Sequence, residues 1–368
     1  MIRKVVIDQG NGGMKGAEVL VKKAVKRNGD VETTRTLNVV NFPSQVGVGD
    51  MNLGGLSLGN ITKRRKDDEP IEISFAGGTY LVGHNVARYA RPLERYDAAK
   101  YTDSMEVRAL TYAALAQLVD GGSNNLAVMV ALPVEVIMAP NYKETVKGIE
   151  GWLLGEHRFT YDGRPASILV EAVKCMAQPV GAFFAWGLNE AGQWNRDEAD
   201  LTDATVAVLD SGFNTLDLLL VKQGRIEKRF TGGDTLGVRV AAEEIARAVK
   251  AQLGFTLSMA EADAFIRQYL DKKKVEVMAA GQKRDLTPII RQALNSLATR
   301  TIDFVQSTWS EANQFSYVLL AGGGALVLDA PLRRKIGHAQ MLPDPVTANA
   351  IGLAKLAQRP GVFKGLVE

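Results

Sequence analysis

The sequence is poor in the residues that build disulfide frameworks and zinc sites. Cys175 is the single cysteine among 368 residues, so no intrachain disulfide can form, and a reducing, cytoplasmic setting is expected. The three histidines, His84, His157 and His338, are far apart in the sequence, which argues against a zinc site. A chain of this length can bury a core that is stable without either kind of cross-link.

Long apolar runs and a strong charge of one sign are also missing. The formal net charge is +3, which by itself does not indicate nucleic-acid binding. The charged run 63–69 is typical of a solvated loop tip, the alternative being a nucleic-acid contact. The longest apolar stretches, such as 126–134, are about half as long as the ~20 residues that a membrane helix needs. The N-terminal residues 1–8 do not resemble a signal peptide. We therefore expect neither a membrane partner nor direct nucleic-acid binding.

Two common nucleotide-binding signatures are absent as well. No glycine-rich turn ends in Gly-Lys-Ser/Thr, and no Gly-x-Gly-x-x-Gly turn joins a strand to a helix. What the sequence has instead is a repeated strand–turn–strand pattern. Val5–Ile7 leads into Asp8 and a glycine-rich turn, and about 200 residues later 204–209 leads into Asp210 and a second turn with Gly212. Two such hairpins indicate two related halves that bind one phosphate ligand.

A third glycine-bearing turn, 322–324, also follows a buried strand, at 317–320. Glycine lets the backbone approach a ligand closely, and free N–H groups in such turns bind phosphate oxygens. One turn of this kind is weak evidence because ordinary hairpins contain glycine. Three of them, two with an aspartate in the same place, favour a phosphate site.

The two aspartates follow apolar strands, where a carboxylate needs a partner. Mg²⁺, held through its waters by carboxylates and phosphates, is a natural partner for Asp8 and Asp210, and the alternative is that each aspartate stabilises its own turn. Lys15 could neutralise phosphate charge or be an exposed strand lysine.

The remaining pattern predicts α/β domains with mixed sheets. Strand 17–21 pairs with the first strand, and the polar stretch 22–33 is expected to be a long turn before strand 36–42. Asp103 is the expected N-cap of a helix that ends near Val119. Further helices are expected over these segments: 143–154, 176–188, 238–253, 259–270, 288–311, 331–336 and 346–357.

Five segments, in order along the chain, resemble the actin-like ATPase superfamily, which includes actin, DnaK-type chaperones and sugar kinases. Residues 8–15 and 210–217 resemble its two phosphate motifs, and 320–325 resembles its adenosine motif. Residues 176–182 and 347–352 resemble its two connecting helices. The resemblance covers nearly the whole chain, and the second phosphate motif is its most specific part.

Short cues place the resemblance in the ParM-like branch of prokaryotic, plasmid, phage and archaeal proteins. They are 42–44, 80–83, 131–134 and 178–181. The resemblance implies a two-lobed, duplicated ribonuclease H-like fold with a central nucleotide cleft. It implies that lobe I holds residues 1–182 and 340–368 and that lobe II holds 183–339. It also implies ATP (or GTP) with Mg²⁺, and filaments that often move DNA through a DNA-bound adaptor.

Carried over by position, the resemblance assigns roles to particular residues. Asp8 and Asp210 would orient Mg²⁺ through its waters, and Gln178 would orient the attacking water. ParM-like members often have glutamate where Gln178 stands, so fast hydrolysis is not implied; the alternative role is a hydrogen bond at the helix start. The other nucleotide-binding candidates are Gly10, Asn11, Gly12, Gly13, Lys15, Gly212, Phe213, Asn214, Thr215, Asp217, Asp234, Lys250, Gly322, Gly323 and Gly324.

Three of these assignments have structural alternatives. Asp217 aligns with Lys15 of the first copy, so it could be a structural member of the motif. Asp234 could cap the following helix, and Lys250 could lie on a solvated helix face. For the whole chain, the alternatives to a filament-forming ATPase are a small-molecule kinase of the same fold, which would need an acidic base, and a non-filamentous nucleotide-dependent binding module.

Overall fold

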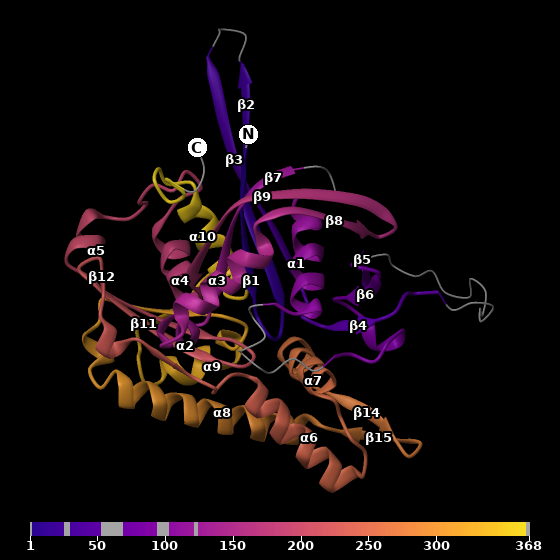
Figure 1. The fold of residues 1–368 in the computed structure, drawn as a ribbon. Helices are drawn as coiled ribbons and strands as arrows, with labels where there is room; N and C mark the ends of the chain where they lie inside the picture. Colours follow the sequence, from indigo (N-terminus) through magenta and orange to yellow (C-terminus); the bar gives the residue numbers. More distant parts are fainter. Residues whose placement is uncertain (1, 26–29, 53–68, 94–102, 121–123, 366–368) are drawn as a thin grey trace. The chain divides into compact units, whose positions relative to one another are not determined.

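A computed structural model describes residues 2–25, 30–52, 69–93, 103–120 and 124–365 (Figure 1). The chain divides into two compact units. The first comprises Met1–Leu132, Val136–Arg196 and Asn349–Glu368, and the second comprises Pro133–Glu135 and Asp197–Ala348. The expected lobe limits at 182 and 339 lie 14 residues before Arg196 and 9 before Ala348, and they stay a prediction. No helix in the described part of the chain is long and apolar enough to cross a membrane.

The first unit is built on a nine-stranded mixed sheet in the order β3-β2-β1-β7-β9-β8-β5-β6-β4. β1 lies inside the sheet, antiparallel to β2 and parallel to β7, so both of its edges are paired. The strands are β1 (Arg3–Gln9), β2 (Met14–Val25), β3 (Val31–Phe42), β4 (Val46–Val48), β5 (Ile71–Phe75), β6 (Gly78–Val82), β7 (Asn124–Leu132), β8 (Gly155–Tyr161) and β9 (Arg164–Ala177).

Helices complete the first unit. They are α1 (Met105–Leu118), α2 (Val134–Met138), α3 (Tyr142–Leu153), α4 (Gln178–Gly187) and α10 (Ala348–Ala357), of which α2 and α10 begin in the second unit. The N-cap of α1 is Ser104, whose hydroxyl accepts a hydrogen bond from the Val107 amide, and the prediction of Asp103 was wrong. Asp103 instead pairs with Arg108 in the first turn of the helix.

Side chains of β1 alternate between two faces of the sheet, as the pleat requires. Val5 and Ile7 belong to the core cluster that also includes residues of α1 and α3. Asp8 therefore points to the opposite face, where Gln178 of α4 reaches it. Gln9 returns to the first face and donates a hydrogen bond to Thr111 of α1. The alternation thus directs the aspartate and its neighbour to different helices.

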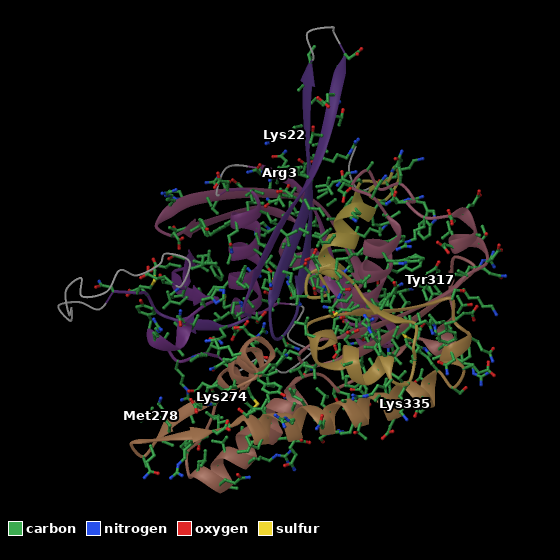
Figure 2. All side chains as sticks on the ribbon, turned by 180° about the vertical axis from the view of Figure 1, so that it is seen from behind. Arg3, Lys22, Lys274, Met278, Tyr317 and Lys335 are labelled. Carbon is green, nitrogen blue, oxygen red and sulfur yellow. The ribbon has the colours of Figure 1, made fainter. Side chains whose placement is uncertain are left out.

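β2 and β3 pair without a register shift from Met14↔Phe42 to Val25↔Val31. Their outer halves extend past the rest of the sheet as a two-stranded ribbon, on which Figure 2 labels Lys22. The prediction of a long turn over 22–33 was therefore wrong, because both strands continue through that stretch up to residues 26–29, which lie outside the described residues. The polar side chains there are exposed on a ribbon that is solvated on both faces. The charged run 63–69 also falls outside the described residues, apart from Glu69.

The second unit contains a six-stranded sheet with the strand order β12-β11-β10-β16-β17, and β13 also pairs with β11. A separate two-stranded sheet, β14-β15, carries the exposed Met278 (Figure 2). The strands are β10 (Thr205–Ser211), β11 (Leu216–Lys222), β12 (Arg225–Ile226), β13 (Gly232–Asp234), β14 (Glu276–Ala279), β15 (Gln282–Asp285), β16 (Tyr317–Ala321) and β17 (Ala339–Met341). The helices are α5 (Glu198–Thr202), α6 (Arg239–Leu253), α7 (Met259–Lys272), α8 (Thr287–Thr308) and α9 (Ala325–Arg333).

Helices α6 to α9 share one core with the sheet of this unit. Ala207 and Leu209 of β10 point into that core, so Asp210 points to the opposite face. Helix α6 is closed by Gly254, its C-cap, which adopts the left-handed conformation. The prediction of a helix over 331–336 was wrong, because α9 starts at Ala325 and contains Pro331.

The two units contain the same strand arrangement with the same register. Asp8 faces Lys15 across the β1–β2 hairpin, and Asp210 faces Asp217 across the β10–β11 hairpin. On the other side, Asp8 is level with Ala131 of the parallel strand β7, and Asp210 is level with Ala321 of the parallel strand β16. The duplicated α/β fold predicted from the sequence is thereby confirmed.

Candidate functional site

In the first unit, Asp8 is the centre of a small polar cluster. Its side chain is 1% exposed, one carboxylate oxygen accepts a hydrogen bond from Gln178 Nε2 at 2.8 Å, and the other lies 3.4 Å from Lys15 Nζ. Lys15 and Gln178 thus provide the cation and the donor that a buried carboxylate needs. The structure brings together three predicted residues that come from two distant segments of the chain.

The turn after Asp8 is compact and leaves backbone amides available. A Cβ on Gly10 would lie 2.7 Å from Lys15 Nζ and 2.8 Å from the carbonyl oxygen of Gly13, so only glycine fits there. Within the described residues, the amides of Asn11, Gly12 and Gly13 donate to no other backbone group. The Gly10 carbonyl oxygen accepts a hydrogen bond from Ser44 Oγ, at 2.5 Å.

In the second unit, the first three carbonyls of the equivalent turn accept hydrogen bonds from the residues at the start of α6, and the Thr215 carbonyl oxygen accepts one from the Gly212 amide at 2.8 Å. The amides of Val238, Arg239 and Gly237 donate to the carbonyl oxygens of Gly212, Phe213 and Asn214, in that order. Gly237 makes this possible, because a Cβ there would collide with the backbone of Phe213 and Asn214. The amides of Phe213, Asn214 and Thr215 belong to the same peptide groups as these three carbonyls, so they point to the other side of the turn.

The side chains of this turn are mostly engaged within the unit. Phe213 packs against the core, and Thr215 donates its hydroxyl to Asp217. Asn214 accepts a hydrogen bond from the guanidinium of Arg239, which also pairs with Glu243 at 2.7 Å. Phosphate binding by Phe213, Asn214 and Thr215 therefore falls to their backbone amides. Arg239 and Gly237 were not among the residues predicted from the sequence, although the glycine before a predicted helix was a usable signal.

Asp217 has its oxygens occupied by groups of its own unit. Oδ1 accepts from the amide of Val134 at 3.0 Å, and Oδ2 accepts from the Thr215 hydroxyl at 2.9 Å. Burial, together with the charge of the neighbouring Asp210, raises the pKa of Asp217 to about 7 in spite of these hydrogen bonds. Such an aspartate fastens the segment Pro133–Glu135 to β11, which favours the structural alternative left open by the sequence.

The third glycine turn packs directly against the end of β10. Gly322 has a φ of +79°, and a Cβ on it or on Gly324 would overlap Ser211. The amide of Gly324 donates to the Ser211 carbonyl oxygen at 2.8 Å, and the amide of Gly322 donates to the Pro345 carbonyl oxygen at 2.7 Å. Gly323 is exposed with open space around it. Of the three glycines, Gly323 is therefore the one with room for a ligand.

The two segments that resemble connecting helices pack closely in the first unit. Gly181 of α4 has no space for a Cβ because the backbone of Asn349 lies against it, and Gly352 of α10 lies against the backbone of Gly181. At the start of α4, no side chain caps the helix, and Gln178 directs its amide to Asp8. The contact with Asp8 is thus the interaction that the structure gives to Gln178.

Two predicted residues lie outside these clusters. Asp234 is exposed on β13, level with Leu216, and it does not cap α6, whose N-cap Val238 makes no side-chain cap hydrogen bond. Lys250 is exposed in the last turn of α6. It lies 11 residues after Arg239, or about 16 Å along the helix axis. A phosphate contact at the α6 N-terminus is out of its reach, and its predicted place beside adenine or ribose stays a prediction.

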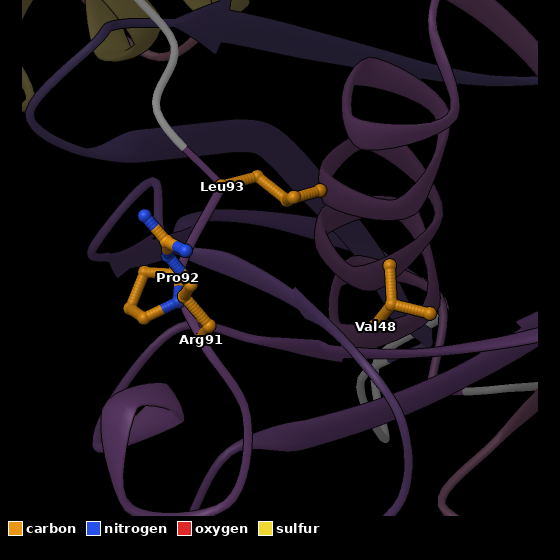
Figure 3. Close-up of a pocket in the computed structure, with 4 residues that line it drawn as sticks. All are labelled: Val48, Arg91, Pro92 and Leu93. Carbon is orange, nitrogen blue, oxygen red and sulfur yellow. The ribbon is translucent and has the colours of Figure 1, made fainter.

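A cavity of about 520 Å³ lies beside β4, lined by Val48, Arg91, Pro92 and Leu93 (Figure 3). Among the described residues, Arg91 is its one ionisable lining residue, and none of the residues predicted from the motifs lines it. The described lining contains no carboxylate and no glycine turn, so it offers no group suited to hydrolysis. The candidate site is therefore the set of strand-end turns described above. The described residues contain no cluster of three or more histidine, cysteine or acidic side chains able to hold a metal ion directly.

Comparisons with known proteins agree with this arrangement. Residues 7–181 match the family described as actin like proteins N terminal domain, and residues 208–334 match the family described as archaeal actin homologue MreB-like, C-terminal. No match was found among curated proteins.

Solved structures show the same fold. A 15-stranded ParM filament from Clostridium botulinum has 20% identity and a TM-score of 0.70, with 97% of this chain and 99% of that chain covered. An archaeal actin homologue in complex with ADP has 19% identity and a TM-score of 0.67, with 97% and 100% covered. With two family matches in order along the chain and the shared duplicated fold, this chain belongs to the actin-like ATPase superfamily.

Proposed function

We propose that this protein binds ATP (or GTP) with Mg²⁺, hydrolyses it, and assembles into filaments in a nucleotide-dependent way. The filaments would serve a cytoskeletal role or the segregation of plasmid or other DNA in the cytoplasm, through a DNA-bound adaptor. Support for assembly comes from the similarity to a ParM filament, and support for nucleotide binding comes from the ADP complex of the archaeal homologue.

The observation that carries the proposal is the repeated turn with outward amides. Each unit has a buried aspartate at a strand end, Asp8 or Asp210, followed by a turn that has amides available for phosphate oxygens. The amides of the first turn are free within the described residues, and those of the second are oriented by α6. Lys15, with 17% of its side chain exposed, adds a positive charge beside the first turn. Ordinary hairpins do not require a buried aspartate followed by a turn with available amides, and here the arrangement occurs in both units.

Gln178 suits the task of orienting water. A carboxylate only accepts hydrogen bonds, so its contact with Asp8 fixes the Gln178 amide nitrogen toward Asp8 and the amide oxygen away from it. That oxygen can accept a hydrogen bond from a water molecule and orient this water toward the terminal phosphate. Hydrolysis of ATP to ADP and phosphate depends mainly on such positioning. A glutamine is a weak base, which is why we expect slow turnover.

The residues present fit a Mg²⁺ ion that is bound through water. Asp8 Oδ2 is buried and accepts no hydrogen bond within the described residues, and its contact with Lys15 is a longer ion pair. Asp8 and Asp210 would hold the waters of the ion, while Asp217 is already occupied by Thr215 and Val134. The ion would neutralise charge on the phosphates.

The test combines nucleotide binding, phosphate release and sedimentation. The wild-type protein should bind ATP with Mg²⁺, release phosphate without an added acceptor, and scatter light and pellet with ATP or a slowly hydrolysed analogue. Asp210→Ala should lose at least 10-fold in turnover and keep its fold, because Asp210 points away from the core of its unit. Circular dichroism and the thermal midpoint check the fold.

The outcomes separate the three functions. Phosphate transfer that requires a small-molecule acceptor would identify a kinase. A protein that binds ATP but stays monomeric at high concentration would be a non-filamentous binding module, and the filament proposal would be wrong. Unchanged turnover in Asp210→Ala would remove this residue from the mechanism.

A further inference from the structure

Ser44 makes an unusual contact for a residue between two strands. It follows the end of β3 and Pro43 and precedes β4, and it is 8% exposed. Its hydroxyl donates to the carbonyl oxygen of Gly10, 34 residues earlier in the chain, at 2.5 Å. The function proposed above gives no task to this hydroxyl.

The geometry of the peptide bond makes this contact important for the turn. The carbonyl of Gly10 and the amide of Asn11 belong to one planar peptide group and point in opposite directions. By holding the Gly10 carbonyl on its own side, Ser44 therefore directs the Asn11 amide to the other side of the turn. Rotation of this peptide changes ψ of Gly10 and φ of Asn11, and asparagine adopts positive φ more readily than most residues, so the peptide could otherwise rotate.

A rotated peptide would present the wrong group to an anion. It would aim the carbonyl oxygen of Gly10, instead of the Asn11 amide, at a phosphate, and the negative end of that dipole repels phosphate oxygens. The second unit avoids this with three backbone donors, the amides of residues 237–239. In the first unit, a side chain 34 residues away takes this role on Gly10. The two turns are thus held by different donors to the same effect.

We propose that Ser44 is a positioning residue for the β- and γ-phosphates of the nucleotide. Its hydroxyl keeps the Gly10–Asn11 peptide in the orientation that donates to phosphate. This inference rests on the proposed nucleotide binding and gives a role to a residue outside the five segments that resemble the superfamily's nucleotide motifs and connecting helices. Ser44 acts through Gly10 and does not itself touch the nucleotide.

The test measures affinities for ATP, ADP and AMP by titration calorimetry, with Mg²⁺ present, for three variants. Ser44→Ala removes the donor and should lower the affinities for ATP and ADP about 10-fold, the loss expected for one phosphate hydrogen bond. AMP has neither distal phosphate, so its affinity should change less than 2-fold. Ser44→Thr keeps the hydroxyl and should stay within about 3-fold of wild type for ATP.

Ser74→Ala is the matched control. Ser74 is part-buried in the same unit, and its hydroxyl shares a hydrogen bond of 3.0 Å with Thr79, away from the turn. Ser74→Ala should change the thermal midpoint by about as much as Ser44→Ala does, and it should leave the ATP affinity unchanged. The comparison separates a loss of stability from a loss of phosphate binding.

Each result decides the matter. If the ATP affinity of Ser44→Ala is within 2-fold of wild type, the positioning role is wrong while the proposed function stands. The same holds if Ser44→Ala lowers the affinity for AMP as strongly as the affinity for ATP. If Ser44→Thr is as weak as Ser44→Ala, shape and not the hydroxyl matters, and the role is again wrong. If the wild-type protein binds neither ATP nor ADP, the proposed function itself fails together with this inference.

Discussion

Three aspartates of this molecule are buried in different surroundings. Asp8 has a nearby cation and an amide donor, Lys15 and Gln178. Asp217 has two donors and, among the described residues, no ion pair, and burial raises its pKa to about 7, so a large share of it is neutral at physiological pH. Asp210 stands level with Asp217 across the hairpin and is the charge that contributes to this shift. Burial alone thus does not make these residues equivalent, and their partners decide which can face a cation.

The aspartates were predictable from the sequence, but their partners were not. A carboxylate after an apolar strand is visible as a local pattern, so Asp8 and Asp210 could be selected. The donors that orient the turns come from distant segments, Ser44 for the first turn and residues 237–239 for the second. No periodicity in a single sequence reports such contacts.

At Gly237, a single methyl group should disturb the second turn. Gly237→Ala would place a Cβ against the backbone of Phe213 and Asn214, so the turn and the start of α6 must separate. We expect a loss of about 2 kcal/mol in the free energy of unfolding, of the size found for overpacked sites. We also expect ATP binding to weaken by more than 10-fold, since the turn amides lose their orientation.

Denaturant unfolding and nucleotide titration check the Gly237→Ala variant. Gly232→Ala is the control, because a Cβ at Gly232 meets nothing within 4 Å. It should keep both stability and affinity. A Gly237→Ala protein with wild-type affinity would mean that the contact between the turn and α6 does not matter for phosphate binding.

At the scale of elements, local patterns predicted the strands beside the turns and the helices with strong periodicity. They were wrong for a polar stretch whose residues lie in solvent-exposed strands and not in a loop. The stretch 22–33 is polar because the ribbon formed by β2 and β3 has solvent on both faces, and its strand pairing continues from the core of the sheet. Pro331 was taken as a helix start, although it lies inside α9. In both cases tertiary context overrode the local signal.

The outer part of the ribbon should be dispensable for folding. Every residue of β2 from Val21 to Val25 is exposed, as are the paired residues Val31 to Arg35, so this part buries little apolar surface. Replacing residues 22–34 by Asn-Gly, which forms a tight turn between Val21 and Arg35, should change the free energy of unfolding by less than about 1 kcal/mol.

Thermal unfolding and ATP titration of the shortened protein test this expectation. The inner pairs, from Met14↔Phe42 to Val21↔Arg35, remain, so the first turn should keep its affinity for ATP. A thermal midpoint lowered by more than several degrees would show that the ribbon stabilises the unit. A shortened protein that binds ATP but no longer pellets would assign the ribbon to assembly.

At the scale of the whole molecule, the main feature is the duplication. The sequence indicated it, and the structure shows that the strands around the two aspartates pair in the same register. Both units place an aspartate level with an alanine of a parallel strand and start a glycine turn at the next residues. The match could be predicted in outline because strand, aspartate and glycine recur in order. The two hairpins differ in the residue that faces the aspartate, which is Lys15 opposite Asp8 and Asp217 opposite Asp210, and this difference is visible when the two motifs are aligned.

This asymmetry predicts opposite pH responses of the two units. In the second unit, the folded-state pKa of Asp217 is raised from 3.8 to about 7, so the folded state holds a proton that the unfolded state releases, and stability falls as pH rises through this window. In the first unit, burial lowers the pKa of His157, which donates to the Leu153 carbonyl oxygen and accepts from Tyr112. The unfolded state then binds the proton more readily, so the stability of this unit falls as pH drops below about 6.5.

Calorimetry of the nucleotide-free protein between pH 5 and pH 8 can separate these responses. Asp217→Asn removes the buried charge at nearly constant shape, so it should raise the thermal midpoint at pH 8 relative to wild type and change it little at pH 5. With that contribution gone, the variant should retain only the rise in stability that His157 imposes between pH 5 and about 6.5. A midpoint that Asp217→Asn lowers equally at both pH values would mean that the carboxylate is needed in its ionised form, as it would be if a cation bound it.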